Sequence, residues 1–427
     1  MRRAHRLALP AGVAIALFAA CRPAPIPPAP APEFSAPVFA SDNDQYGASE
    51  PTLWADSHGN LAAAWIDWTP PHPRIRVATS SNGGASFTRS RLLSPDDAAH
   101  GDGQADVSLA STGDGRLFVS WLACRHDEDA PTNSACDVEA AVSRDAGLSW
   151  TALPAIATGG AAHRERDWLA SANGRVWASW TENLAHGAEW VVAVDSAGRF
   201  AERARVRGKA SLSGPIVEMG GALDVLLMDR PSPKPGEVWL ERRRSKDAGR
   251  TWETEGTISF DRAAALLPYS MGMLGAAGGG GEWVAIPRGD GTENDFVLGW
   301  RPPALDVFRT APTLRVSPRA RVGMPWFSPR PDGTTLVAWI EEGDDGWRVM
   351  ARLLTDHQHR TAAADLSRAP FRFQEASLTE NIGDYLAIAT AGTSSWVAFS
   401  DTTAGRARIR CSRLSVQGRA AVGLHPR

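Results

Sequence analysis

The sequence has few of the residues and patterns that mark several large protein classes. Its 427 residues include only 4 Cys and 3 Tyr, and the 45 Lys and Arg do not outnumber the 48 Asp and Glu. Nucleic-acid-binding proteins usually carry a basic excess, so a formal net charge of −3 argues against that class. We therefore expect no nucleic acid among the partners of this protein.

Several chemical signatures are also absent. The chain contains no His-Glu-x-x-His, no Cys-x-x-Cys, no P-loop and no dinucleotide-binding pattern. The glycine run at 275–281 joins two expected strands with no helix to follow, which argues against phosphate binding there. We expect no organic cofactor.

The N-terminal residues 1–21 have the anatomy of an export signal. Three Arg precede an apolar run over 7–20, which is too short for a membrane-spanning helix. The run ends Leu17-Phe18-Ala19-Ala20-Cys21. This ending resembles the lipobox of bacterial lipoproteins, and the resemblance implies a lipid on Cys21; an ordinary cleaved signal is the alternative. We expect an exported protein anchored by lipid to the bacterial cell envelope, with a secreted or periplasmic protein as the alternative.

The next segment, 22–44, is predicted to be a tether. It begins with the Pro-Ala run RPAPIPPAPAP, and proline fixes φ and removes backbone donors, so the run is expected to be extended and semi-rigid. Residues 45–427 are predicted to form one domain. Export permits disulfides, so Cys124 and Cys136 are expected to pair across a polar loop; a pairing with Cys411 remains the alternative.

A repeat predicts the fold of this domain. The 40 Gly and 30 Pro favour short strands and turns over long helices. One unit recurs seven times, and its second strand has its centre at Trp65, Trp121, Trp180, Leu227, Ala285, Trp339 and Phe399. These centres lie 47 to 60 residues apart. The spacing fits four-stranded antiparallel blades, so we predict an all-β, seven-bladed β-propeller, with six blades as the alternative.

A second pattern lies later in the unit. SRDAGLSW (143–150) and SKDAGRTW (245–252) share Ser-x-Asp-x-Gly-x-Ser/Thr-Trp, and SSNGGASF (80–87) is a degenerate copy. Short polar side chains and glycine suit a hydrogen-bonded turn, so these Asp residues are expected to be structural. The pattern resembles the Asp-box, or BNR repeat, of the sialidase superfamily. The resemblance covers nearly the whole chain after the tether and implies a propeller with its ligand face opposite these turns.

Carboxylates are expected to converge on that ligand face. Four innermost strands begin at or near Glu50, Asp106, Asp167 and Asp384, and we assign these residues to one equivalent position. Second strands end in further acids, at Asp67, Glu182, Asp229, Glu341 and Asp401. Clustered carboxylates raise one another's pKa, as glycoside hydrolysis requires, and they also suit Ca²⁺. The alternative is that acids at strand ends only solvate a rim.

The resemblance to sialidases suggests roles for particular residues. Such enzymes bind the substrate carboxylate with three Arg and use a Tyr–Glu nucleophile pair with an Asp acid/base. Here Tyr385 would be the nucleophile, assisted by Asp384 or Glu50, and Asp106 or Asp167 would be the acid/base. The sugar-binding candidates are Arg166, Arg230 and Arg288. The family's Phe/Tyr-Arg-Ile-Pro motif is absent.

These observations predict a sialidase-like propeller that recognises carbohydrate or glycoprotein, with exo-glycosidase activity on acidic sugars as the candidate reaction. The alternative is a non-catalytic surface propeller that binds a protein or glycan. We expect a monomer whose contact with the membrane is made through the N-terminal lipid alone.

Overall fold

The computed structural model describes residues 27–93, 103–125, 135–159, 164–182, 189–195, 199–207, 210–229, 237–261, 273–289, 294–303, 308–311, 313–316, 320–374 and 377–415. This part of the chain is almost entirely β-structure, and its one helix is the 3-10 turn η3 (Gly278–Gly280). No helix long and apolar enough to cross a membrane occurs among these residues.

The described strands pair as seven antiparallel sheets. The first four in chain order are β2–β5 (Ala48–Ala55, Leu61–Asp67, Arg74–Ser80, Arg91–Leu92), β6–β9 (Gly103–Ser111, Leu117–Arg125, Ala135–Ser143, Thr151–Ala152), β10–β13 (Arg164–Ala172, Arg175–Glu182, Glu189–Asp195, Phe200–Arg207) and β14–β18 (Ala210–Ser213, Val217–Met219, Ala222–Asp229, Glu237–Ser245, Glu253–Asp261). The others are β19–β22 (Met273–Ala276, Glu282–Gly289, Asn294–Arg301, Arg309–Ala311), β23–β26 (Arg321–Pro329, Thr335–Gly343, Gly346–Leu354, Ala364–Asp365), and β27–β29 (Ala387–Ala391, Ser394–Asp401, Arg408–Arg413) with β1 (Val38–Phe39).

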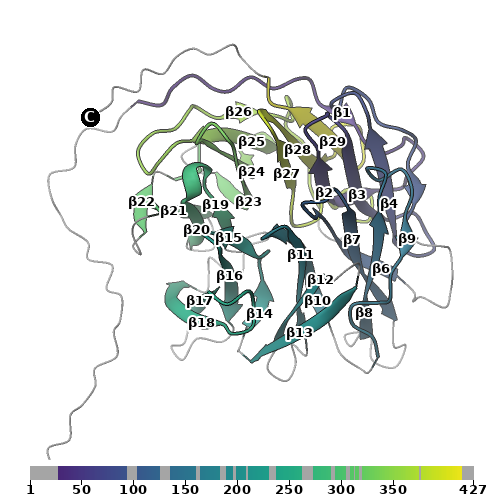
Figure 1. Cartoon of the computed structure of the whole chain (residues 1–427). Helices are drawn as coiled ribbons and strands as arrows, with labels where there is room; N and C mark the ends of the chain where they lie inside the picture. The colour runs from purple at the N-terminus through teal and green to yellow at the C-terminus, as the bar shows by residue number, and fades with distance from the viewer. Residues whose placement is uncertain are drawn as a thin grey trace, which may run out of the picture.

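The sheets surround a common centre, and the chain is an all-β propeller with four-stranded antiparallel blades (Figure 1). The innermost strands are β2, β6, β10, the pair β14 and β15, β19, β23 and β27, and each contacts the next around the ring. One hydrophobic cluster of described residues lies between each pair of neighbouring sheets. All seven predicted second-strand centres are buried in these clusters or beside them.

The ring is closed by both ends of the chain. Strand β1 pairs with β29, so Val38 lies opposite Cys411 (Figure 1). Ala29 and Phe34 also make β-bridges, to Thr361 and Leu414. Several residues of the predicted tether, among them Val38 and Phe39, thus pair with the strands of the propeller. The signal segment 1–21, with Cys21, lies outside the described residues.

The three Ser-Asp/Asn turns, at 80–87, 143–150 and 245–252, share one hydrogen-bond pattern. In the second, the Ser143 hydroxyl donates to Asp145 Oδ1 at 2.7 Å, and Asp145 Oδ1 accepts from Ser149 N at 2.8 Å. Ser245 and Asp247 form the same contacts in the third turn. These Asp residues bind their own turns, which fits the predicted structural role.

A disulfide joins Cys124 on β7 to Cys136 on β8. The two residues lie directly opposite each other in the sheet. Cys411 is a buried free thiol on β29. The loop 126–134 between the paired cysteines lies outside the described residues.

Candidate functional site

Bulges at the start of the innermost strands place the candidate site. The pairing register shifts in β2, β6, β10 and β23. The shifts coincide with positive φ angles at Glu50 (55°), Asp106 (39°), Arg166 (57°) and Met324 (51°). Such backbone is strained for residues with a side chain, and it commonly marks functional positions. Gly383, with φ of 78°, stands before β27 at the matching place.

This register corrects one sequence interpretation. The four innermost strands can be aligned on a shared leucine, which is Leu53, Leu109, Leu169 or Leu386. The residue three positions before this leucine has a positive φ in each strand, and it is Glu50, Asp106, Arg166 or Gly383. Asp167 and Asp384 therefore come one residue later than Glu50 and Asp106, and the four predicted carboxylates do not share one position. A one-residue offset in a strand reverses the side of the side chain, so different orientations follow.

Arg166 lies at the centre of the cluster. Its Nη1 donates to Asp384 Oδ1 at 2.7 Å, and its Nη2 donates to Asp384 Oδ2. Its backbone N–H donates to Asp106 Oδ2 at 2.9 Å. Two parallel bonds from one guanidinium to one carboxylate fix geometry well, so Arg166 and Asp384 orient each other.

Tyr385 lies beside this ion pair. Its hydroxyl accepts a hydrogen bond from Val107 N at 3.2 Å. The hydroxyl also lies near the Glu50 carboxyl group, where it partly opposes the rise in the pKa of Glu50. Glu50 in turn covers Gly383, where an added Cβ would lie 2.1 Å from Glu50 Cγ. The Glu50 side chain therefore requires a glycine at 383. The Tyr385 ring is only 4% exposed and contacts Trp168, with ring centroids 5.3 Å apart.

Two carboxyl groups of this cluster, those of Asp106 and Glu50, hold their protons unusually tightly. Burial raises the pKa of Asp106 to about 6. The charge of Arg166 opposes this rise, and the charges of Glu165 and Asp384 add to it. Burial and the charges of Asp384 and Asp106 raise the pKa of Glu50 well above its usual range. Burial followed by the Glu50 charge raises the pKa of the Tyr385 hydroxyl. Groups that titrate near neutrality are suited to acid/base chemistry.

Asp167 belongs to a different environment. It is 3% exposed, and neither of its carboxylate oxygens has a hydrogen-bond partner of normal geometry in the described structure. Burial raises its pKa well above the usual range, the Asp106 charge raises it further, and the Ser120 hydroxyl partly opposes this. Asp167 thus lacks the hydrogen bond from the Arg166 backbone that Asp106 receives, and its acid/base role stays a prediction.

Four of the five second-strand acids, those with described side chains, do not form an acidic rim. Each of the following is buried and bound: Asp67 to Arg76, Glu182 to Arg164 and Trp180, Glu341 to Trp339, and Asp401 to Arg410 and Thr403. Burial without a partner would be costly, and these contacts supply the partner. These four acids stabilise the sheets.

The predicted Arg clamp is represented in the described residues by Arg166 alone. Arg230 lies outside the described residues, and Arg288 is on β20 with a side chain outside them. Among the described residues no group of three or more His, Cys, Asp or Glu has an arrangement that could hold a metal ion. The suggested Ca²⁺ therefore has no described ligand set.

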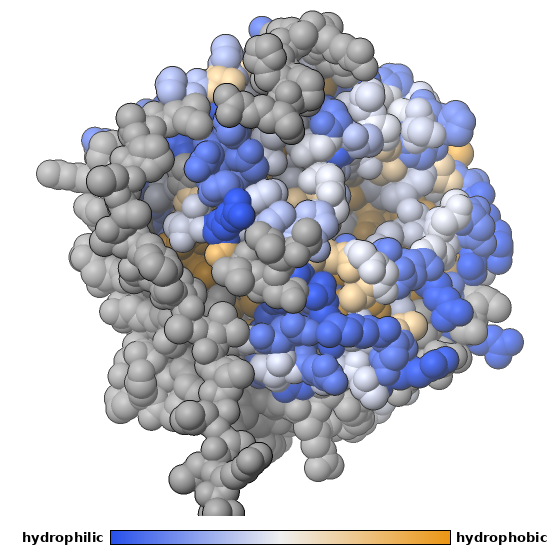
Figure 2. Space-filling view, turned by 60° about the vertical axis from the view of Figure 1, so that its left-hand side comes forward, coloured by the Kyte–Doolittle hydropathy of each residue, from blue (hydrophilic) through white to orange (hydrophobic). Residues whose placement is uncertain are grey.

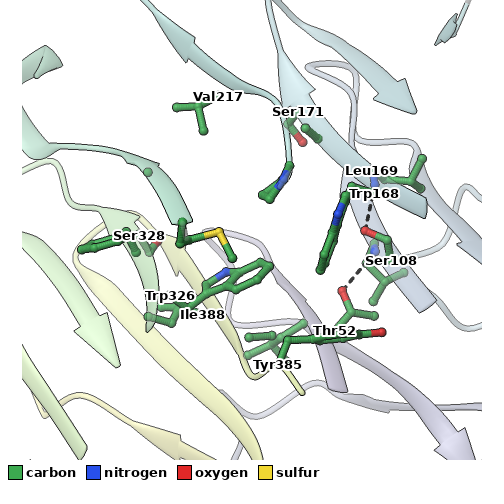
Figure 3. A pocket seen from close by; sticks show the side chains of 18 of the residues that line it. Thr52, Ser108, Trp168, Leu169, Ser171, Val217, Trp326, Ser328, Tyr385 and Ile388 are labelled. Atoms are coloured by element: carbon green, nitrogen blue, oxygen red, sulfur yellow. Dashed lines mark hydrogen bonds between the residues drawn. The ribbon is translucent and has the colours of Figure 1, made fainter. Parts of the chain in front are cut away.

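A cavity of about 500 Å³ lies along the axis of the ring, next to the cluster. Residues of the innermost strand of each sheet, or residues next to that strand, line it. The rings of Trp168, Trp326 and Tyr385 lie close together in its lining (Figure 3). Over the outer surface, hydrophobic residues are visible mainly in recesses between hydrophilic ones (Figure 2). The sequence analysis did not predict Trp168 and Trp326 as site residues. Each of them lies two positions after a residue with positive φ, which is Arg166 or Met324.

Comparison with known proteins identifies the fold. No family model and no curated protein matches the chain. A solved protein of unknown function from Dyadobacter fermentans is similar over 91% of this chain and 100% of its own, with a TM-score of 0.54 and 14% identity. The Hadza microbial sialidase Hz136 is similar over 88% of this chain and 67% of its own (TM-score 0.51, 12% identity).

A Penicillium chrysogenum alpha-L-arabinanase, solved with arabinobiose, is similar over 90% of this chain and 99% of its own, with a TM-score of 0.50 and 14% identity. Likeness at these identities concerns the fold alone. The sialidase-like propeller fold is thus supported by solved structures.

Proposed function

We propose that this protein is a glycoside-acting propeller whose site is the cluster of Glu50, Asp106, Arg166, Asp384 and Tyr385. The observation that carries the proposal is the position of the buried Tyr385 hydroxyl beside the carboxyl groups of Glu50 and Asp106, of which Asp106 has a pKa raised to about 6. A tyrosine activated by a carboxylate is a nucleophile, and a carboxyl group with such a pKa is a general acid near neutrality.

In this proposal each residue has one task. Glu50 accepts the proton of Tyr385 as the hydroxyl attacks the anomeric carbon, and Asp106 protonates the leaving oxygen. Water then attacks the glycosyl–tyrosine bond while Asp106 accepts its proton and Tyr385 recovers the proton from Glu50. The Arg166–Asp384 pair holds the surrounding carboxylates in place. The product keeps the anomeric configuration of the substrate, as in two-step glycoside hydrolysis.

The charge of the cluster favours a neutral sugar over the acidic sugar expected from the sequence. The Arg166 guanidinium is already bound by Asp384, so it is not free to bind a sugar carboxylate. A sugar carboxylate would have to displace Asp384 and would be repelled by its neighbours. An arabinanase and a sialidase share this fold, so the fold itself accommodates both kinds of sugar.

A panel of 4-methylumbelliferyl glycosides, neutral and sialic-acid-bearing, tests the proposal. We expect hydrolysis of a neutral member, and we expect both Tyr385→Phe and Asp106→Asn to lower kcat by about 10²–10⁴. Tyr46→Phe is the matched control because Tyr46 is 44% exposed and far from these contacts. Equal rates for Tyr385→Phe and Tyr46→Phe would refute the assigned nucleophile.

A non-catalytic glycan-binding propeller is the second candidate. Two observations favour it: the closed Arg166–Asp384 pair and the low exposure of Tyr385. It predicts glycan binding that Asp106→Asn leaves intact, without hydrolysis of any glycoside in the panel. Carbohydrate or glycoprotein is the expected partner in both cases.

The proposal takes each of the seven sheets as one blade, which the contacts between neighbouring innermost strands support. It also places the propeller at the cell envelope, with the lipid on Cys21 as its anchor, because the N-terminal sequence has the lipobox-like ending. Cys21→Ser should move the protein from the membrane fraction to the soluble fraction. Unchanged membrane association of Cys21→Ser would refute lipid anchoring.

A further inference from the structure

The axial cavity extends beyond the carboxylate cluster, and Tyr385 borders both places. Thr52, two residues after Glu50, lines the cavity, and its lining continues along the strands to Ser171 and Ser328. These strand ends lead to the face that carries the Ser-Asp/Asn turns, because the turn after β2 contacts the first such turn through a Gly83 N to Gly59 O bond of 3.0 Å. The cavity therefore extends away from the proposed glycoside site.

Aromatic rings separate the two places. The Trp168 centroid lies 5.5 Å from that of Trp326 and 5.3 Å from that of Tyr385 (Figure 3). Met273 and Ile388 add apolar surface below them. Rings at this spacing offer both faces and edges to another ring, so the upper end of the cavity suits a flat or cyclic molecule.

The lining carries almost no charge. Glu218 is the one charged residue among the lining side chains described, and it is exposed at the rim, where its Oε2 accepts from Asn173 N at 2.6 Å. An ion that entered the cavity would lose its water without gaining a partner of opposite charge, which is costly. The cavity therefore selects against charged molecules.

The polar groups of the lining are matched to a hydrogen-bond acceptor. Thr52 Oγ1 accepts from Leu109 N at 3.0 Å and Ser108 Oγ accepts from Leu169 N at 2.8 Å, which leaves both hydroxyl protons available (Figure 3). No described residue accepts from these hydroxyls or from the Trp326 indole N–H. The Ser171 and Ser328 hydroxyls also belong to the lining, but they are bonded to Ser111 O and Thr390 Oγ1, so three donors remain.

We propose that the axial cavity is a second binding site, for a small uncharged ring compound that carries a hydrogen-bond acceptor such as a carbonyl oxygen. A volume of about 500 Å³ is within the range of small-molecule sites. A free sugar does not fit this description, because its many hydroxyl groups would exceed the polar partners that the lining offers. The inference is independent of the proposed glycoside activity.

Acetophenone, benzoate, toluene and glucose distinguish the possibilities in ligand-observed NMR titrations of the full chain. Acetophenone should bind most tightly, toluene more weakly, and benzoate and glucose should not bind. Trp326→Phe keeps a ring but removes a donor, so it should weaken acetophenone binding roughly fivefold and leave toluene unchanged.

A matched pair of substitutions locates the binding. Val217 lines the cavity, as Figure 3 shows, whereas Val316 is 52% exposed outside it. Val217→Phe should weaken acetophenone binding at least tenfold, while Val316→Phe should leave it unchanged. Benzoate binding as tight as acetophenone, equal affinities for the two Val variants, or an acetophenone affinity unchanged in Trp326→Phe would overturn the proposal. If Val217→Phe does not fold, the acetophenone affinity of Trp326→Phe provides the test instead.

Discussion

The same residue type behaves in opposite ways at the two ends of the propeller. In the Ser-Asp/Asn turns, hydrogen bonds from the Thr251 hydroxyl and backbone N–H lower the pKa of Asp247 to about 2. At the axis, burial raises the pKa of Asp106 to about 6. A carboxylate that is exposed and fully bonded stabilises a turn, whereas one that is buried among other carboxylates retains its proton. The surroundings, and not the residue, decide which Asp can do chemistry.

The largest expected effect comes from removing the only described cation of the cluster. Arg166→Gln would leave Asp384, Asp106 and Glu50 without their counter-charge. Loss of one partner of a buried ion pair typically costs about 3–5 kcal/mol. We expect a loss near this size at pH 8, measured by chemical unfolding.

The loss should be smaller at pH 5, where the carboxyl groups can take up protons instead. The exposed pair Arg89–Asp44, 3.1 Å apart, provides the control, because Arg89→Gln should change stability by less than about 1 kcal/mol at either pH. Equal losses for the two variants would contradict the central role of Arg166.

Asp167→Asn should remove a pH dependence of stability. Because burial raises the pKa of Asp167 in the folded protein, the folded state holds a proton that the unfolded state has released. Stability contributed in this way falls as pH rises from about 4 toward the folded pKa, by about 1.4 kcal/mol per pH unit for one proton. The Asn variant should therefore gain stability relative to wild type as pH rises, in urea melts between pH 4 and pH 8.

Asp247→Asn should give a smaller effect of the opposite sign. The folded pKa is lowered, so the stability from Asp247 is present above about pH 4 and is lost as pH falls toward 2. At pH 7 the variant should lose a modest amount, because Asn keeps an acceptor oxygen, as Asn82 does in the first turn. A gain in stability at pH 7 would contradict the structural role of the turn.

Activity should also depend on pH in a defined direction. If Asp106 acts as the acid, it must be protonated, so kcat/KM should fall as pH rises through about 6. Glu50 must be ionised at the same time, and because its pKa is also raised, only a fraction of the molecules should be active in acidic solution. Activity that rises steadily from pH 6 to pH 9 would exclude Asp106 as the acid.

The sequence predicted more of the fold than of the site. The Trp-bearing second strands are regular because each must fill the space between two sheets, and Trp65 and Trp339 are fully buried as expected. The turns were predictable because their hydrogen bonds are local. The pairing of β1 with β29 was not, because Val38 and Cys411 are far apart in the chain and a Pro-rich run gives no pairing signal.

The geometry of the site depends on a one-residue offset between the innermost strands, which the repeat pattern alone does not show. Glu50 and Asp106 occupy the same place as Arg166 and Gly383, so Asp167 and Asp384 come one residue later. The common Leu at 53, 109, 169 and 386 could have shown this offset. The contact of Arg166 with Asp384 could not be predicted, because it joins residues 218 apart and depends on ring closure.

Site-resolved carboxyl NMR titration of Asp106 and Asp247 in one sample tests the central claim most directly. The account predicts that Asp106 titrates at about pH 6 and Asp247 at about pH 2. An Asp106 midpoint at or below about 4, the ordinary value for Asp, would contradict the claim that the axial cluster holds its protons for acid/base chemistry.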